Sequence, residues 1–264
     1  PRGEVAERDD VVVLGDQLDE DSSAFDGIDR DLDVVLMVEA LEESTHVWSH
    51  KARTTLFLSA MRHFAQDLAR RLAPLRVEYR SLHGHRDATL ADGLRAALLR
   101  YQPQCVICVD PGDMRVRQMI EAEMTASPAV RLQWREDQHF LCSVPQFGAW
   151  AGQSTSLRME FFYRSMRKQY RVLMDGDKPV GGKWNYDAEN RKGFGRAGPH
   201  DVPRPPVFEP DAVTREVMVI VEKEFAGHPG KLEHFNWPVT RQDALRALVV
   251  LQAQVAAQLL QRVA

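Results

Sequence analysis

The sequence predicts an α/β protein with a doubly wound, mainly parallel five-stranded sheet and a C-terminal helical and irregular extension. Two observations carry this prediction. Short apolar runs alternate with segments whose apolar residues recur every three or four positions between residues 11 and 134, and the connections are short. This alternation is typical of parallel sheets with helices on both faces, because the crossover between parallel strands is usually a helix.

The five strands are predicted from runs rich in Val, Leu and Ile, at residues 11–14, 34–38, 75–79, 104–109 and 130–134. The runs at 11–14 and 34–38 are continuous and apolar, which indicates strands that are buried on both faces in a parallel sheet. Residues 49–71 place Phe57, Met61, Phe64, Leu68 and Leu72 on one helical face. Residues 89–101 and 113–124 are predicted as further helices.

The character of the chain changes after residue 134. Residues 157–174 predict a basic amphipathic helix, and residues 176–210, rich in Gly and Pro, predict a long irregular connection. Thr240 and Asp243 resemble a capping box that opens a last helix to residue 264. We therefore expect an α/β domain at 1–145, the basic helix and connection at 146–239, and the start of a helical domain at 240–264.

Composition excludes several protein classes. Apolar residues make up 44% and charged residues 27% of the 264 residues, which excludes collagen-like and wholly disordered chains. No apolar run approaches the roughly 18 residues of a membrane span, and the N-terminal residues lack the apolar core of a signal peptide. Three cysteines without a framework spacing fit a reducing compartment. We expect a cytoplasmic protein with no membrane partner.

Polar side chains follow two of the central predicted strands. Asp16 and Gln17 follow the first strand and Glu39 follows the second, and doubly wound sheets bind ligands at these carboxyl ends. These groups suit a polyol or ring-nitrogen ligand, although Asp16 and Asp110 would equally serve as turn caps. The chain has neither a Gly-rich dinucleotide fingerprint nor a phosphate loop, which disfavours NAD and ATP chemistry.

No metal site is predicted. His46 and His50 have the spacing of a metal pair, but the Glu that should follow the first His is missing, so solvated or capping histidines are favoured. Cys105 and Cys108 would point to opposite faces of a strand.

A basic region stands out at residues 151–200, which hold ten Lys and Arg against five Asp and Glu in a chain of net charge −4. Aromatic residues alternate with cations here, which suits phosphate contacts and stacking on nucleic-acid bases. A loop pinned by Trp184 and Tyr186, with solvated cations, explains the pattern equally well.

Five segments carry a resemblance to a known family. They are LGDQL at 14–18, ESTHVWSHKAR at 43–53, FLSAMRHF at 57–64, FFYRSMR at 161–167 and GGKWNYDAENRK at 181–192. Together they resemble the deoxyribodipyrimidine photolyase-related proteins, the iron–sulfur bacterial cryptochromes and (6-4) photolyases. The resemblance covers most of residues 11–240, and the segment at 181–192 is the most specific.

The resemblance implies a Rossmann-like antenna domain in this chain, with a 6,7-dimethyl-8-ribityllumazine-like chromophore. It implies FAD and a four-cysteine [4Fe-4S] cluster only in a helical C-terminal half that this chain does not reach. Members of the family are DNA photolyases, which are lyases. We nevertheless expect no DNA repair by the isolated chain, and we leave open whether this chain is an enzyme. We also expect self-association through an apolar face of the terminal helix.

The resemblance also assigns candidate site residues. The antenna-binding candidates are Asp16, Gln17 and Glu39, followed by Ser44, His46 and Lys51. The DNA-binding candidates are Lys183, Arg191 and Lys192, followed by Arg164 and Arg167.

Two functions therefore compete. The first is the antenna domain of a photolyase- or cryptochrome-related protein in light-dependent DNA repair or light sensing, with DNA as partner of the full-length parent. The alternative is a chromophore-free scaffold or interaction module of the same fold. A small-molecule enzyme is disfavoured, because no nucleophile, base and metal site converge.

Overall fold

A computed structural model describes residues 8–153, 156–185, 196, 198 and 204–263. The chain forms two compact units. Unit 1 consists of Pro1–Asp137 and Pro205–Ala264, and unit 2 consists of Gln138–Arg204. These units are defined by packing, so the domain limits expected at 145/146 and 239/240 from composition stay predictions.

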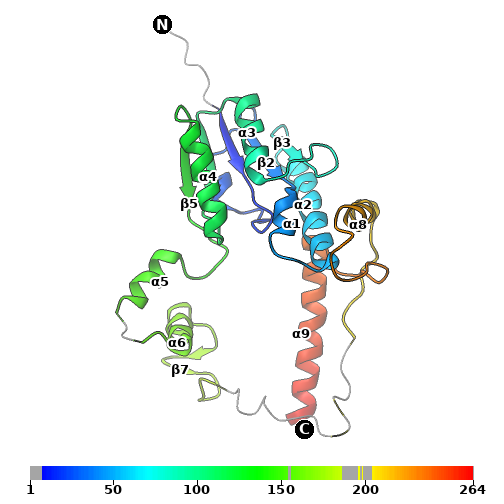
Figure 1. The fold of residues 1–264 in the computed structure, drawn as a ribbon. Helices are drawn as coiled ribbons and strands as arrows, with labels where there is room; N and C mark the ends of the chain where they lie inside the picture. The colour runs from blue at the N-terminus through cyan, green and yellow to red at the C-terminus, as the bar shows by residue number, and fades with distance from the viewer. Residues whose placement is uncertain (1–7, 154–155, 186–195, 197, 199–203, 264) are drawn as a thin grey trace. The chain divides into compact units, whose positions relative to one another are not determined.

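Unit 1 contains a five-stranded parallel sheet in the order β3-β2-β1-β4-β5 (Figure 1), which confirms the predicted doubly wound fold. The strands are β1 Asp9–Val12, β2 Val34–Val38, β3 Arg76–Arg80, β4 Cys105–Val109 and β5 Arg131–Arg135. β1 begins two residues before the predicted run, because Asp9 and Asp10 also pair with β4. The strand order reverses at β1: the chain adds β2 and β3 on one side and β4 and β5 on the other.

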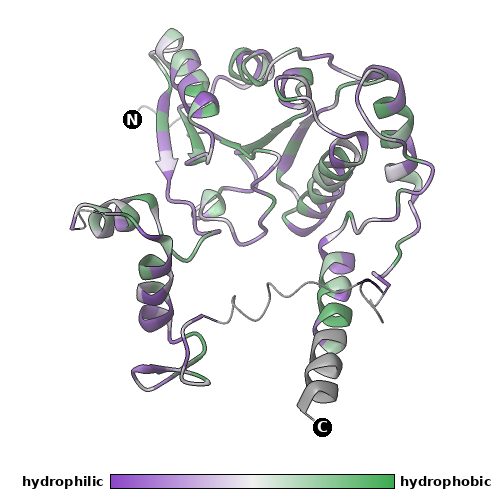
Figure 2. Cartoon of the chain, turned by 60° about the horizontal axis from the view of Figure 1, so that its bottom comes forward, coloured by the Kyte–Doolittle hydropathy of each residue, from purple (hydrophilic) through white to green (hydrophobic). Residues whose placement is uncertain are grey.

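Helices cover both faces of this sheet. The helices α3 Leu90–Tyr101 and α4 Met114–Ala126 bury their apolar residues against one face. The other face packs on α2 Lys51–Arg71, and α8 Ala212–Glu224 packs on α2 (Figure 1). Colouring by hydropathy shows the central strands as the hydrophobic layer between the helices (Figure 2). Cys105 and Cys108 belong to clusters on opposite faces, as predicted.

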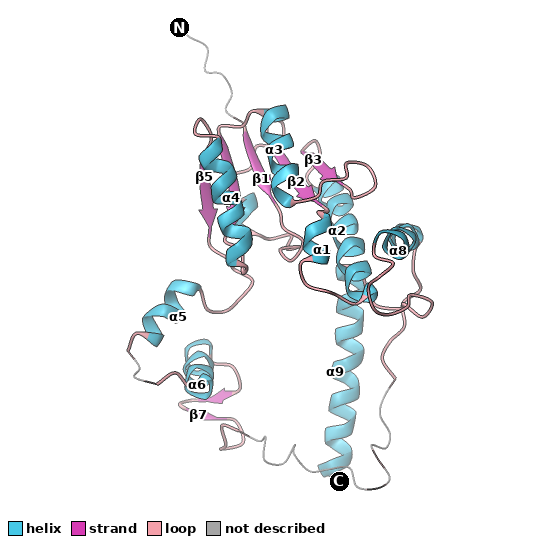
Figure 3. Cartoon of the chain, in the orientation of Figure 1, coloured by secondary structure: helices cyan, strands magenta, loops and turns pink. Residues whose placement is uncertain are grey.

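Figure 3 shows the remaining helices and strands. They are η1 Ser23–Phe25, α1 Leu41–Thr45, α5 Val144–Ala151, α6 Met159–Tyr170, β6 Met174–Asp175, β7 Lys178–Pro179 and α9 Arg241–Val263. The predicted basic helix is α6, which ends at Arg171 in the left-handed region with φ 54°. The predicted cap of the last helix is confirmed, since Thr240 Oγ1 accepts from the Asp243 N–H at 3.1 Å.

None of the helices in the described ranges is long and apolar enough to span a membrane.

The helix α8 follows the predicted irregular stretch at 176–210 and lies within the segment 146–239 expected to be the basic helix and connection, where no second helix was predicted. Asp211 caps it by accepting from the Thr214 N–H at 2.8 Å, and Val217, Val221 and Phe225 are almost fully buried. A segment of the expected connection is therefore part of the core of unit 1.

Two ion pairs and one histidine–carboxylate contact join α2 to α8 and its N-cap residue. Lys51 Nζ lies 2.5 Å from Glu222 Oε2, and Arg62 Nη1 lies 3.0 Å from Glu216 Oε1. His63 Nε2 lies 3.0 Å from Asp211 Oδ2. Every basic partner is on α2 and every acidic partner on or next to α8, so these pairs favour the antiparallel arrangement of the two helices.

The loop after α8 braces the start of α2. The Lys51 N–H donates to the Pro229 carbonyl at 2.9 Å, and His228 Nδ1 lies 2.9 Å from the Ser49 carbonyl oxygen. Gly230 has φ +92°, and a Cβ there would lie 1.9 Å from His50 Nε2. His50 caps α2 by accepting from the Ala52 N–H.

Replacing Gly230 by alanine should therefore destabilise the protein. The new Cβ would strain the backbone and displace the capping imidazole, so we expect Gly230→Ala to lower the free energy of unfolding by about 1–3 kcal/mol. Gly227→Ala is the matched control, because a Cβ at Gly227 meets nothing within 4 Å, and its effect should stay within about 0.5 kcal/mol. Urea unfolding measures the free energy of unfolding of both variants. Equal destabilisation by Gly230→Ala and Gly227→Ala would contradict a stabilising contact between the loop after α8 and the start of α2.

Asp10 is a buried acid in β1. Among the described residues neither of its carboxylate oxygens has a hydrogen-bond partner. Burial, partly offset by the charge of Arg8, raises the pKa of Asp10 to about 7. The unfolded chain therefore releases this proton near pH 4, while the folded protein keeps it up to about pH 7.

Stability from this group is consequently present below pH 4 and lost as the pH rises toward 7. Asp10→Asn should remove this loss. We expect the variant to be more stable than the wild type at pH 8 by on the order of 1–3 kcal/mol, and the gap to narrow at pH 5. Urea unfolding at both pH values tests this, and a gap that does not change with pH would count against it.

Candidate functional site

A cavity of about 490 Å³ lies at the carboxyl ends of β1, β2 and β4, and thus at the point where the strand order reverses. Residues after β1 and β2 form its floor, α1 with the following turn forms one wall, and the first half of α2 forms another. Residues at the start of α3 and α4 complete it. The polar residues that line it are Asp16, Glu39, Glu43, Ser44, His46, Ser49, Arg53, Thr54 and Asp113.

The wall formed by α2 is mainly apolar. Phe57, Leu58 and Met61 line the cavity from this helix, and their spacing places them on one helical face. A Cβ at Gly15 would lie 2.9 Å from Met61 Sδ. Glycine after β1 therefore lets α2 approach the floor closely.

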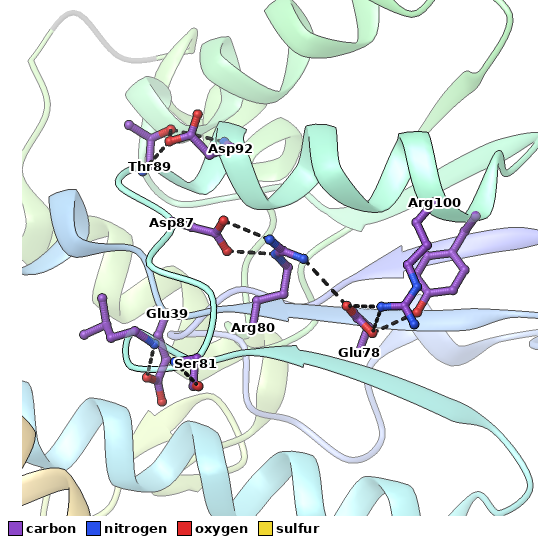
Figure 4. Close-up of polar contacts among 11 residues, drawn as sticks. Glu39, Glu78, Arg80, Ser81, Asp87, Thr89, Asp92 and Arg100 are labelled. Atoms are coloured by element: carbon purple, nitrogen blue, oxygen red, sulfur yellow. Dashed lines mark hydrogen bonds and ion pairs between the residues drawn. The ribbon is translucent and has the colours of Figure 1, made fainter.

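The wall formed by α1 is held by the loop that follows β3. The N–H groups of Leu41 and Glu42 donate to the carbonyls of Asp87 and Ala88, at 3.3 and 2.9 Å. Arg80 in turn holds Asp87 with two hydrogen bonds of 2.7 and 2.9 Å (Figure 4). The loop therefore sets the position of this wall.

Glu39 occupies the centre of a buried polar network beneath the cavity. Its Oε1 accepts from Arg62 Nε at 2.7 Å and from the Tyr79 hydroxyl at 2.6 Å. Its Oε2 accepts from Arg62 Nη2 at 3.0 Å and from the Leu82 N–H at 2.8 Å. Burial, followed by the charge of Glu39, raises the pKa of Tyr79, so the phenol stays a donor. Four donors therefore already occupy the carboxylate.

The other antenna-binding candidates are divided by the structure. Asp16, Ser44 and His46 line the cavity together. Lys51 is turned to Glu222 on α8, and Gln17 Nε2 donates to the Val109 carbonyl at 3.2 Å, so neither lines it. Their part in ligand binding stays a prediction.

The cavity mouth is acidic. Asp16 is exposed and, within the described residues, has no hydrogen-bond or ion-pair partner. Arg115 pairs with both Glu43 and Asp113, at 2.8 and 3.3 Å. Hydrogen bonding from the Arg115 N–H lowers the pKa of Asp113. Arg53 lies over the Phe57 ring, 5.1 Å from its centroid.

Unit 2 contains the described part of the candidate nucleic-acid interface. Three cations surround the Trp184 ring: Arg164, Arg167 and Lys168 lie 5.3–5.7 Å from its centroid. Arg167 is buried and donates to the carbonyls of Val172 and Leu173, whereas Arg164 pairs with Glu160. The ring of Trp184 is half-buried and in contact with cations. Tyr186, the second residue of the pinned-loop alternative, lies outside the described residues, so the pinned loop and the DNA contact both stay predictions.

The other DNA-binding candidates are less defined. Lys183 is exposed next to Trp184. Arg191 and Lys192 lie outside the described residues.

Sequence reasoning missed Thr54 as a cavity residue. It is buried in the wall formed by α2, and its hydroxyl has no hydrogen-bond partner among the described residues. Its position three residues before Phe57 and seven before Met61 was the available signal, since these spacings share a helical face.

Comparisons with known proteins identify the family of the chain. Residues 11–237 match the family model of the deoxyribodipyrimidine photo-lyase-related protein. The chain is 40% identical over 241 residues to a protein named (6-4) photolyase from Agrobacterium fabrum, an alignment that covers 90% of this chain and 46% of that protein. It is 32% identical over 88 residues to the uncharacterized protein R852 of Acanthamoeba polyphaga mimivirus, covering 32% of this chain and 44% of that protein.

This chain therefore spans about half the length of each of these relatives. The family match extends over the strands, the cavity and α8. The chain belongs to the deoxyribodipyrimidine photo-lyase-related protein family.

Proposed function

We propose that this chain is the antenna-chromophore domain of a photolyase-related protein that acts in light-dependent DNA repair or light sensing. The observation that carries the proposal is the cavity at the strand-order reversal, which has an apolar wall and a polar mouth. Its volume of about 490 Å³ falls within the range of small-molecule sites.

The residues of the cavity fit an uncharged ribityllumazine better than a nucleotide. A planar ring would lie against Phe57, Leu58 and Met61, and the ribityl hydroxyls would reach Asp16, Ser44 and His46 at the mouth. A phosphate there would face Asp16 and the Glu43 and Asp113 carboxylates, which already share Arg115. When bound, such a chromophore supplies light absorption, while the chain supplies its orientation.

Titration with 6,7-dimethyl-8-ribityllumazine, riboflavin and FMN, followed by absorption and fluorescence, tests this proposal. We expect saturable binding of at least one phosphate-free ligand and about tenfold or more weaker binding of FMN than of riboflavin, because the mouth repels phosphate. Asp16→Asn should reduce the difference in affinity between riboflavin and FMN. Asp21→Asn is the control, since it removes the same charge from an exposed carboxylate that does not line the cavity.

Absence of binding by all three ligands would favour the chromophore-free scaffold instead. Equal binding of FMN and riboflavin would contradict the electrostatic argument while leaving the antenna role intact.

We also propose that the basic part of unit 2 contacts DNA. The cations around Trp184 and the neighbouring Lys183 support this proposal, as does the name of the Agrobacterium relative. Because a phosphate contact releases counterions, Lys183→Ala should weaken DNA binding by the chain and reduce the slope of log affinity against log salt by about one.

The control for that experiment is Lys231→Ala, which removes an exposed cation of unit 1 that pairs with Glu233. Fluorescence anisotropy with labelled DNA at several salt concentrations measures the slopes. An identical slope for the wild type and Lys183→Ala would refute the contact.

That FAD and the [4Fe-4S] cluster are not held by this chain stays a prediction. The chain has three cysteines, and Cys105 and Cys108 lie on opposite faces of the sheet, so these cysteines do not form the four-cysteine site that the resemblance implies.

Self-association remains a prediction, supported by Leu245, Leu248 and Val249, which α9 exposes. Cytoplasmic localisation also remains a prediction.

A further inference from the structure

A second cavity, of about 340 Å³, lies between the loop that follows β3 and the end of α8. Leu41 and Leu82 contribute apolar surface to it. Three basic residues also line it: His83 and Arg86 from the loop and Lys223 from α8. It shares no lining residue with the cavity at the strand-order reversal, so the two cavities are separate.

The loop between β3 and α3 is fixed on both sides of its basic residues. The Leu82 N–H donates to Glu39 Oε2 at 2.8 Å. Arg80 holds the Asp87 carboxylate with two hydrogen bonds (Figure 4). Residues 83–86 therefore lie between two anchored positions, and their backbone has a defined place beside the cavity.

Arg86 has a backbone conformation that is rare for a residue with a side chain. Its φ is 59°, in the left-handed region, which residues other than Gly, Asn and Asp seldom adopt. Among the described residues, neither the Arg86 guanidinium nor the His83 imidazole has a hydrogen-bond or ion-pair partner. Strained backbone is frequent at binding sites, and here it belongs to an unpaired cation that lines a cavity.

The charges around the cavity favour an anion. The acidic residues that line it, Asp87 and Glu224, already have partners. Asp87 is held by Arg80, and Glu224 Oε1 lies 3.3 Å from Lys223 Nζ. Both members of the second pair are exposed, so the pair contributes little net stability. An incoming anion can therefore compete with Glu224 for the ammonium group.

We propose that this cavity binds a phosphate dianion, either free or as the phosphomonoester of a small molecule, through His83, Arg86 and Lys223. A guanidinium donates two parallel hydrogen bonds to phosphate oxygens, an imidazole donates one, and an ammonium group adds a point charge. The volume suits a phosphate with a small substituent, which would contact Leu41 and Leu82. The proposal is independent of the chromophore, because the two cavities have no residue in common.

NMR titration of the whole chain with inorganic phosphate and with glycerol 3-phosphate, at pH 7 and constant ionic strength, tests the proposal. We expect saturable shifts of the amide signals of residues 82–88 and 223–224. Acetate, which has two oxygens and a single charge, should not produce them at the same concentration. Tighter binding of glycerol 3-phosphate would identify a phosphomonoester as the ligand, and tighter binding of inorganic phosphate would identify the free anion.

Three variants test the assigned residues. Arg86→Gln should weaken phosphate binding about tenfold, because it removes charge-assisted hydrogen bonds. Glu224→Gln should strengthen binding about two- to fivefold, because it removes the carboxylate that competes for Lys223. Arg30→Gln is the matched control, since Arg30 is an exposed arginine of unit 1 that does not line the cavity, and its effect should stay below about twofold.

Thermal unfolding without ligand checks that each variant folds, and we expect Arg86→Gln to match the wild type because its side chain is exposed and unpaired. Absence of phosphate binding by the wild type would overturn the site. Equal weakening by Arg86→Gln and Arg30→Gln, or amide shifts away from this cavity, would also overturn it. Acetate binding as tight as phosphate binding would overturn the phosphate assignment.

Discussion

The ion pair between Glu39 and Arg62 connects more of unit 1 than any other interaction described above. Glu39 directly follows β2, Arg62 lies in the middle of α2, and Tyr79 belongs to β3. Arg62 also reaches Glu216 on α8. Removing one partner of such a buried pair leaves an uncompensated charge, which is far more costly than the net value of the intact pair. The sheet, its covering helix and the returning segment are thereby tied to one point directly under the cavity.

This network also explains why an acid at a strand end need not be a ligand group. Position alone makes Glu39 and Asp16 equivalent, since both follow strands at the binding edge of the sheet. The difference comes from α2, which brings a guanidinium to Glu39 and leaves Asp16 exposed at the mouth. Only the packed structure distinguishes the two carboxylates, because the cation lies 23 residues away from Glu39 in the sequence.

Much of the fold could be predicted because local signals agreed with the final packing. The strands β2 and β4, at 34–38 and 105–109, are buried on both faces and contain only apolar residues. The capping pair Thr240 and Asp243 marks the start of α9 correctly. The helix α8 was not predicted, because the Gly- and Pro-rich stretch before it indicated a connection. The periodicity of Val217, Ile220 and Val221 was present, but its burial depends on α2, which is remote in sequence. Thr54 was missed for a similar reason: a threonine within a helix has no local mark of an unpaired hydroxyl.

The return of the chain to unit 1 after unit 2 has a consequence for folding during synthesis. The first 137 residues supply every strand of the sheet, but Val217, Val221, Phe225 and Phe235 of its core follow the whole of unit 2. One face of α2 therefore stays uncovered while the ribosome translates the intervening residues, at roughly 5–20 residues per second. The nascent sheet domain spends several seconds with an apolar surface exposed, which is the interval in which chaperones would engage it.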